Sequence, residues 1–589
     1  MTSIGICKIK SEYIIAEQKK ELNLDLVSDK DKEKLFIHKD QHDDEEPAPK
    51  KQKLSKKEKK KLKGQNKSRG PTFRIERSQE LCSSLISTLD GETPKCERKN
   101  CDFLHDASKY LELKPKDIGE HCYNYQISGK CSRGLACRFG SEHISSEGRN
   151  EVDEEKYAQF TSSGPPTKNH LEYNIQTALR KRTYNFDLSE ALVKYNDLRK
   201  KGFKTEKHET NCEEIKVLSG TVTDEDIITL RKREKLQINW NDKLFLSPLT
   251  TVGNLPFRRI CKEFGVDVTC GEMAMCSALL QGAPQEWALV KRHKSEDIFG
   301  VQLCANNPHL LTKCGQLLTN ETEIDFIDLN LGCPIELVYK QGGGCGLLRR
   351  PKVLESCVQN LSDILPIPLT IKMRMGVYNN ENVAHILAPK MRDCGASLIT
   401  IHGRSREQRY TKSANWEYIK TVAEVAAPIP VLGNGDILTY QDYMKAKETV
   451  PQLAGVMIGR GALIKPWIFK EIKEQKLWDI SSSERFDILK KYTNYGLEHW
   501  GSDNKGVENT RRFMLEWLSF LYRYVPVGLL ECPPQKINER PPFYKGRDEL
   551  ETLMASPSAS DWIKISEMLL GPVPENFHFL PKHKANSYD

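Results

Sequence analysis

Two groups of cysteine and histidine residues near the start of the chain have the types and order of ligands in a zinc site. Each group has three cysteines followed by one histidine, with the spacings C-x13-C-x4-C-x3-H and C-x8-C-x5-C-x5-H. Three thiolates and one imidazole form a closed tetrahedral site, which holds a small module together without a large core. We therefore expect two structural zinc ions, bound by Cys82, Cys96, Cys101 and His105 and by Cys122, Cys131, Cys137 and His143.

Both groups resemble CCCH zinc fingers, a class that binds RNA, and Phe103 and Phe139 closely follow their third cysteines. In such fingers, exposed aromatic and arginine side chains stack on or contact single-stranded RNA. A zinc module with a purely structural role is the alternative.

A second kind of chemistry is suggested by Cys333 and Cys345, which lie twelve positions apart in "NLGCPIELVYKQGGGCG" (330–346). The pair could bind a metal, form a disulfide, consist of two inert thiols, or include one catalytic thiol. No histidine lies in this stretch to complete a zinc site. The choice between an inert and a catalytic thiol depends on the element that positions each cysteine.

The region from about residue 240 onward alternates short apolar runs with helical segments. We expect strands at 244–249, 266–273, 298–304, 325–333, 368–375, 397–404, 429–436 and 455–461, with helices between them such as 254–265, 353–364, 382–395 and 440–449. Eight such repeats predict an α/β fold, a parallel (β/α)8 TIM barrel. A doubly wound sheet is the alternative.

Polar residues interrupt the apolar runs at the carboxyl ends of these strands, where barrels carry their active sites. They are Thr250, Glu272, Gln302, Asn330, Cys333, Lys372, Arg374, His402, Arg404, Asn434 and Asp436. An unpaired buried charge is costly, so a core strand has no use for Lys372 or His402. The glycine-rich turns 433–436 and 459–461 follow the last two strands, where barrels commonly bind phosphate through backbone amides, and Arg460 adds charge there. The pattern predicts a phosphorylated ligand across the mouth of the barrel.

Six stretches resemble the consecutive signatures of tRNA-dihydrouridine synthases: "SPLTTVGNLPFRRI", "LNLGCP", "IKMRMG", "IHGRSREQRY", "GNGDI" and "MIGRGALIKPWIF". These are FMN enzymes in which a barrel is followed by a helical RNA-binding domain. The resemblance covers about 240–570. With the two fingers, the whole chain resembles the eukaryotic zinc-finger type, which is associated with the uridine of the tRNA variable loop.

The resemblance implies roles for the residues at the strand ends. FMN would be bound by Pro248, Leu249, Thr250, Gln302, Lys372, His402, Asn434, Gly435, Asp436, Gly459 and Arg460, and the substrate by Asn330 and Arg404. NADPH (or NADH) would reduce FMN, which would pass a hydride to C6 of the uracil. Cys333 would then donate the proton to C5, because a thiol with an ordinary pKa of about 8.5 is mostly protonated at neutral pH. Cys345 is the second choice for this role.

The remaining regions complete a five-part organisation of the 589 residues. We expect a mostly disordered basic tail at 1–75, two zinc fingers at 76–145, a partly helical connector at 146–240, the catalytic barrel at 241–480 and a helical tRNA-binding domain with a tail at 481–589. The tail holds ten lysines and one arginine between Lys50 and Arg69 and is compatible with nuclear import or loose RNA contact. A helix at 188–202 should have Leu188, Leu192, Tyr195 and Leu198 on one side.

The C-terminal domain combines a predicted aromatic face with many basic residues. Phe513, Trp517, Phe520 and Tyr524 recur at helical spacing and should belong to its core. The surface that contacts the tRNA backbone should include Arg511, Arg512, Arg523, Lys536, Arg540, Lys545 and Arg547.

The sequence lacks a signal peptide and any apolar run of 18 or more residues. We therefore expect a protein of the cytoplasm and nucleus that does not associate with a membrane and whose cysteines are mostly thiols or metal ligands. We expect it to be a monomer that binds tRNA, with mRNA as a further candidate partner. Two other functions compete: a non-catalytic zinc-finger RNA-binding protein with a barrel scaffold, and another FMN barrel that acts on a small molecule. The latter would leave the fingers and the basic tail unexplained.

Overall fold

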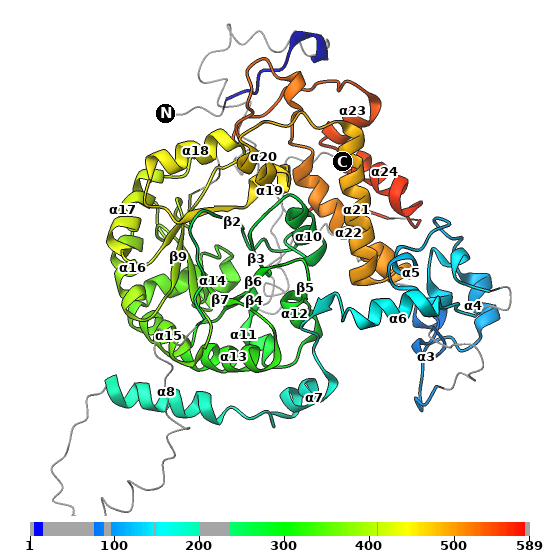
Figure 1. Cartoon of the computed structure of the whole chain (residues 1–589), viewed down its shortest axis with the longest axis horizontal. Helices are drawn as coiled ribbons and strands as arrows, with labels where there is room; N and C mark the ends of the chain where they lie inside the picture. The colour runs from blue at the N-terminus through cyan, green and yellow to red at the C-terminus, as the bar shows by residue number, and fades with distance from the viewer. Residues whose placement is uncertain are drawn as a thin grey trace, which may run out of the picture.

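Eight parallel strands close into a barrel in the computed structural model, which describes residues 5–15, 76–86, 96–145, 149–200, 236–408, 410, 412–575 and 577–582 (Figure 1). The strands are β2 (Lys243–Leu246), β3 (Val268–Cys270), β6 (Ile298–Cys304), β7 (Phe326–Leu331), β8 (Leu369–Arg374), β9 (Leu398–His402), β10 (Val431–Asn434) and β11 (Gly455–Ile458). Each pairs with the next in parallel, and β11 pairs with β2, which closes the ring. The predicted TIM barrel is confirmed, and all eight expected strands are present.

Helices surround the barrel. Because its strands are parallel, their carboxyl ends all lie at the same end of the barrel. The surrounding helices include α10 (Leu255–Glu263), α13 (Pro308–Glu321), α15 (Pro351–Ile364), α16 (Ala384–Asp393), α17 (Trp416–Ala426), α18 (Tyr440–Thr449), α19 (Arg460–Ile464) and α20 (Ile468–Glu474). At the opposite end, Trp240 packs edge-on against Phe326 with ring centroids 5.6 Å apart. This small apolar cluster fills the amino-terminal end of the barrel, so the open end is the one that carries the polar residues.

A helical domain follows the barrel and shares a hydrophobic core with it. It contains α21 (Ser482–Trp500), α22 (Asn504–Leu521), α23 (Glu549–Ala555) and α24 (Ala559–Leu570). Trp517, Phe520 and Tyr524 are buried, and the half-buried ring of Phe513 stacks on Trp500 at 4.6 Å. The predicted aromatic face is therefore part of the domain core.

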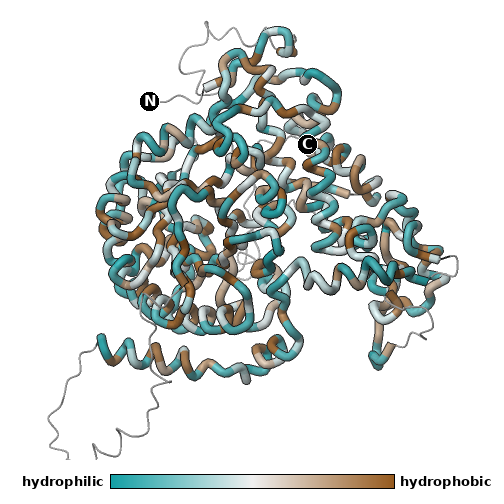
Figure 2. The backbone as a smooth tube through the Cα atoms, viewed as in Figure 1, coloured by the Kyte–Doolittle hydropathy of each residue, from teal (hydrophilic) through white to brown (hydrophobic). Residues whose placement is uncertain are grey.

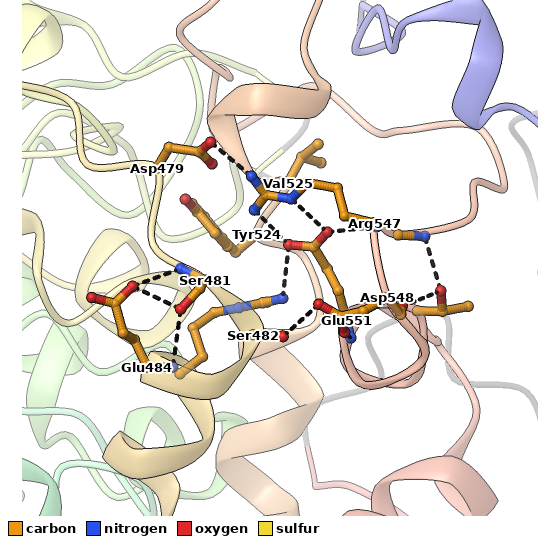
Figure 3. A network of polar contacts seen from close by, with 12 residues as sticks. Asp479, Ser481, Ser482, Glu484, Tyr524, Val525, Arg547, Asp548 and Glu551 are labelled. Carbon is orange, nitrogen blue, oxygen red and sulfur yellow. Dashed lines mark hydrogen bonds and ion pairs between the residues drawn. The ribbon is translucent and has the colours of Figure 1, made fainter.

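Two of the arginines expected on the RNA-binding surface hold this domain together instead. Arg511 is fully buried and donates to the carbonyl groups of Leu570 and Gly571. Arg547 donates to Asp479 and Glu551, which ties the chain before α21 to α23 (Figure 3). Sequence composition identified the arginines but not the carboxylates and carbonyls that fold beside them.

The described part of the connector contains three helices, α6 (Glu154–Ser162), α7 (Tyr173–Lys181) and α8 (Asp187–Lys200), and α8 lies along the outside of the barrel (Figure 1). The predicted helix is present, and its geometry places Leu188, Leu192, Tyr195 and Leu198 on one side, as expected. Leu188, Tyr195 and Leu198 are nevertheless exposed. Figure 2 shows apolar and polar segments alternating along the backbone of α8. The buried face includes Asn196, which donates to Asn360 at 2.6 Å, because polar partners on α15 compensate its burial.

The extreme N-terminal segment packs on the C-terminal domain, which corrects the prediction of a disordered tail for residues 5–15. Its backbone forms bridges from Ile6 to Arg540, from Ile9 to Leu530 and from Ile14 to Tyr544. Ile9 is 2% exposed within an apolar cluster of that domain. The alternating apolar residues of 5–15 suit a strand that is added to the edge of another segment. The prediction of disorder rests on the charged residues farther along the tail and does not take this alternation into account. Residues 16–75, with the run Lys50–Arg69, lie outside the described residues.

Among the helices of the described part of the chain, none combines the length and the hydrophobicity needed to cross a membrane.

The N-terminal contact can be tested at Ile9. Ile9→Ala should lower the free energy of unfolding of the C-terminal domain by about 2–4 kcal/mol, because it leaves a cavity in a closed apolar cluster. Ile6→Ala is the matched control, since Ile6 is 40% exposed, and should change the free energy by less than about 0.5 kcal/mol. Denaturant unfolding measures both values, and equal effects would refute the packed arrangement.

Candidate active site

A cleft of about 2650 Å³ opens at the carboxyl ends of the barrel strands and extends to the C-terminal domain. It is lined by every residue expected for catalysis, cofactor binding and substrate binding: Pro248, Leu249, Thr250, Gln302, Asn330, Cys333, Lys372, His402, Arg404, Asn434, Gly435, Asp436, Gly459 and Arg460. The facing wall includes Arg512, Arg523, Arg540 and Lys545. The fold thus brings together groups that are spread over some 300 positions of the sequence.

Asn330, at the end of β7, fixes the turn that carries Cys333. Its side-chain oxygen accepts hydrogen bonds from the backbone N–H groups of Gly332 at 3.1 Å and of Cys333 at 2.9 Å. Its amide nitrogen donates to the side-chain oxygen of Gln302 at 2.7 Å. One amide hydrogen of Asn330 remains for a ligand.

Asp328 extends this hydrogen-bond chain into the barrel, and sequence reasoning missed it. Its carboxylate accepts from Nε2 of Gln302 at 2.7 Å and from Oγ1 of Thr370 at 2.7 Å. Because the carboxylate accepts the amide of Gln302, the carbonyl oxygen of Gln302 is left to face Asn330. Burial raises the pKa of Asp328. The signal in the sequence is the alternation in "FIDLNL", which puts Asp328 and Asn330 on the same face of β7.

Cys333 is the thiol that reaches the cleft, whereas Cys304 and Cys345 are fully buried behind it. Burial raises the pKa of all three thiols, to about 12 for Cys304 and about 11 for Cys345. Cys333 is 8% exposed, so it is a protonated thiol at neutral pH with access to a ligand. Gly344 has φ of +53°, and a Cβ there would lie 2.9 Å from Cβ of Cys333. The glycine run therefore lets the following loop pack directly against the cysteine.

Lys372 contributes an ammonium group to the cleft, and His402 contributes a neutral imidazole. Removal from water, with Arg374 nearby, lowers the pKa of Lys372 to about 8. Burial and the surrounding cations hold the pKa of His402 well below its usual range, so its imidazole is neutral. Nε2 of His402 lies 3.4 Å from Nη1 of Arg404. Because a guanidinium only donates, Nε2 accepts and the proton is assigned to Nδ1.

Asp436, which follows β10, pairs with two arginines, Arg404 after β9 and Arg460 after β11. Nη2 of Arg404 lies 2.6 Å from its carboxylate, and so does Nη2 of Arg460. Arg404 is fully buried and also donates to the carbonyl of Lys412. In this arrangement Arg404 supports Asp436, and its expected contact with the substrate stays a prediction. Asp436 in turn orients Arg460, whose guanidinium lies 4.1 Å from the ring of Tyr410.

One glycine beside these arginines lets the turn after β10 pack closely against Ala414. Gly435 has φ of +145°, and a Cβ there would lie 2.5 Å from Cβ of Ala414. A residue other than glycine is therefore strained and crowded at this position. Together with Gly459 and the Arg460 guanidinium, the turn forms an anion-accepting corner of the cleft.

The structure also assembles both predicted zinc sites. In each set of three cysteines and one histidine, the ligand atoms all lie within 4.8 Å of one another. Nε2 of His143 is buried and has no hydrogen-bond partner among the described residues, whereas its Nδ1 lies 3.0 Å from Oδ1 of Asn150. A second partner of this kind orients a ligating imidazole, so the donor set and its surroundings fit Zn²⁺.

Comparison with known proteins gives consistent matches along the chain. Residues 245–519 match the family model described as dihydrouridine synthase (Dus). Proteins named tRNA-dihydrouridine(47) synthase [NAD(P)(+)]-like are 53% identical in Xenopus tropicalis, over 91% of this chain and 84% of the relative, and 52% identical in Homo sapiens, over 90% and 84%. The relative of that name from Arabidopsis thaliana is 40% identical over 86% of this chain and 85% of its own length.

The support of Cys333 by Asn330 can be tested by alkylation. Asn330→Ala should speed modification of Cys333 roughly tenfold, because the turn loses hydrogen bonds worth about 1 kcal/mol each. Asn330→Asp keeps an acceptor oxygen and should largely preserve the protection. Mass spectrometry of the modified peptides measures the rates, with the exposed Cys532 as internal reference. An unchanged rate in Asn330→Ala would show that this side chain does not hold the turn.

Proposed function

The chain belongs to the dihydrouridine synthase family, and from that premise we propose that it reduces the C5=C6 bond of a uridine in tRNA with electrons from NADPH or NADH, using FMN bound in the cleft. The observation that carries the proposal is the convergence, in one cleft, of the protonated thiol of Cys333, the cation Lys372 and the anion-accepting corner at Gly435 and Arg460. A barrel used only as a scaffold has no need for this set of groups.

The residues present fit FMN. The corner at Gly435, Gly459 and Arg460 suits its phosphate, since a glycine turn and a guanidinium both favour an anion. Lys372, which has no hydrogen-bond partner among the described residues, suits an oxygen of the ring system, and Pro248–Thr250 and Gln302 would lie against the ring. When bound, FMN supplies hydride transfer from the nicotinamide to C6 of the uracil.

Cys333 supplies the proton in this proposal. Reduction at C6 leaves C5 in need of a proton, and a thiol whose pKa is raised by burial holds one at neutral pH. Asn330 serves twice, because it fixes the Cys333 turn and keeps one amide hydrogen for the base. The proton donor and a donor to the base are thereby positioned by the same side chain.

The C-terminal wall of the cleft supports tRNA as the substrate. Arg512, Arg523, Arg540 and Lys545 line it, and cations at that place neutralise backbone phosphates. A uracil must leave its stack to reach the barrel mouth, at a cost of a few kcal/mol that such contacts offset. We propose the variable-loop uridine as the target, in line with the position 47 in the relatives' names, and mRNA as a second substrate. We also propose that the protein acts as a monomer in the cytoplasm and nucleus.

The assignment of Cys333 predicts a separation of the two half-reactions. Cys333→Ala should keep its flavin and still oxidise NADPH, but dihydrouridine formation should fall by about 10²–10⁴-fold, the range of a lost general acid. Mass spectrometry of tRNA nucleosides and flavin absorbance measure the two halves. Cys532→Ala is the control, since Cys532 is an exposed thiol. A collapse in Cys345→Ala with full activity in Cys333→Ala would move the role to Cys345, and a colourless protein that binds tRNA would favour the scaffold alternative.

Lys372 predicts a pH dependence of flavin binding. Its pKa of about 8 in the free site means that the ammonium is charged below that pH and neutral above it. The affinity of the flavin-free protein for FMN should therefore fall as the pH rises through about 8, as quenching of flavin fluorescence would show. Lys372→Arg keeps its charge and should flatten the profile, whereas Lys372→Met should bind weakly throughout. A wild-type affinity that is constant across this range would contradict the role of Lys372.

A further inference from the structure

We propose that the two zinc modules have different functions: the second is a structural joint that fixes the C-terminal helical domain, and the first alone presents groups to RNA. The first module comprises residues 76–86 and 96–113, and the second residues 114–145 and 149–153. The RNA half of this inference rests on the proposed function, because it concerns the tRNA substrate. The structural half does not.

The second module is bonded to the turn between α21 and α22. The backbone N–H of Arg138 donates to the carbonyl of Ser502 at 2.8 Å, and its guanidinium donates to Asn504 at 2.7 Å. Arg133 pairs with Asp503 at 3.5 Å. Sγ of the zinc ligand Cys131 lies 3.5 Å from Oγ of Ser502. The two arginines that would suit RNA phosphates are therefore engaged with the protein.

The turn itself is shaped for this contact. Gly501 has φ of +105°, and a Cβ there would lie 2.5 Å from Nε of Arg133. A residue with a side chain would both strain the backbone and displace the arginine. The absence of a side chain at Gly501 thus leaves room for Arg133 of the second zinc module.

Burial gives the same picture for the apolar part of the second module. Its four ligands are at most 1% exposed, and its three cysteines belong to the same hydrophobic cluster as Leu497 and Val507 of α21 and α22. Phe139, the aromatic residue expected to stack on a base, is only 9% exposed and belongs to that cluster too. The second zinc site is thus part of the core of the C-terminal domain, and Phe139 does not offer an open ring for base stacking.

The first module differs from the second in the exposure of its ligands and in its attachment to the rest of the protein. Cys96 and Cys101 are half-buried and His105 is exposed. A small cluster attaches the module, in which Leu81 and Tyr110 pack on Leu135 and Ala136 of the second module. In Figure 1 its helices α3 (Ser83–Ile86) and α4 (Ala107–Leu113) lie at the edge of the molecule that is remote from the barrel.

The open surface of the first module has the chemistry that RNA requires. Arg98 and Lys99 are exposed next to the ligands, and Phe103 is half-buried. Arg98 donates to Oγ of Ser83 at 3.1 Å, which orients the guanidinium without neutralising it. Cations beside an accessible ring suit the phosphates and bases of a single-stranded segment. The second module therefore acts as a rigid adaptor between this surface and the catalytic body.

Matched ligand replacements in the full-length holoprotein test the inference. Cys131→Ser and Cys96→Ser should each lose one of two zinc ions, as metal analysis would show. Only Cys131→Ser should lower the unfolding temperature of the body that contains the barrel and helical domain, by about 4 °C or more. Cys96→Ser should leave that temperature unchanged and weaken tRNA binding roughly tenfold. The structural half is overturned if Cys131→Ser leaves the unfolding temperature unchanged, or if Cys96→Ser lowers it equally.

Paired arginine replacements keep the test decisive if Cys131→Ser fails to fold. Arg138→Ala should retain both zinc ions, lower the unfolding temperature by about 2–4 °C and change tRNA affinity less than twofold. Arg98→Ala should do the reverse, with an unchanged unfolding temperature and weaker tRNA binding. Equal losses of affinity in the two variants would overturn the division of roles. A wild-type protein that binds no tRNA would refute the proposed function, whereas the unfolding temperatures would still decide the structural half.

Discussion

The side-chain oxygen of Asn330 accepts both backbone N–H groups of the turn that carries Cys333, and the arrangement of the cleft depends on this interaction. An amide can hold a turn in this way only if its own orientation is fixed. Gln302 fixes it, and the buried carboxylate of Asp328 fixes Gln302 in turn. Because these residues come from neighbouring strands of a closed barrel, the position of the Cys333 thiol is set by the register of the sheet.

Electrostatics impose a second constraint on the same cleft. Lys372, Arg374, Arg404 and Arg460 gather near the barrel mouth, while Asp436 is the carboxylate that pairs with two of them. Removal from water, together with the neighbouring cations, lowers the pKa of Lys372 to about 8 and the pKa of Arg460 to about 10. Such a site is stabilised by an anionic ligand, since the ligand relieves both costs at once. The excess of cations therefore favours an anionic ligand independently of any sequence motif.

The parts of this molecule that the sequence predicted are those encoded by local spacing. The eight strands follow from short apolar runs, and the zinc ligands follow from cysteine and histidine spacing. What the sequence did not reveal depends on partners far along the chain. Arg404 and Arg460 both line the cleft and both pair with Asp436, but only Arg404 is fully buried and also donates to the carbonyl of Lys412. The sequence likewise did not reveal which face of α8 is buried, because Asn196 has its hydrogen-bond partner, Asn360, on α15.

The two walls of the cleft belong to different domains, so the site exists only if those domains keep a fixed relative position. A hydrophobic core shared by the barrel and the helical domain supplies most of this constraint. The N-terminal segment adds to it, because it pairs with the chain around Leu530 and Arg540 that forms the outer wall. The second zinc module contributes from another direction, at the turn between α21 and α22. A metal site distant from the chemistry thus bears on the geometry of the cleft, since it limits the movement of the helices from which Arg512 projects.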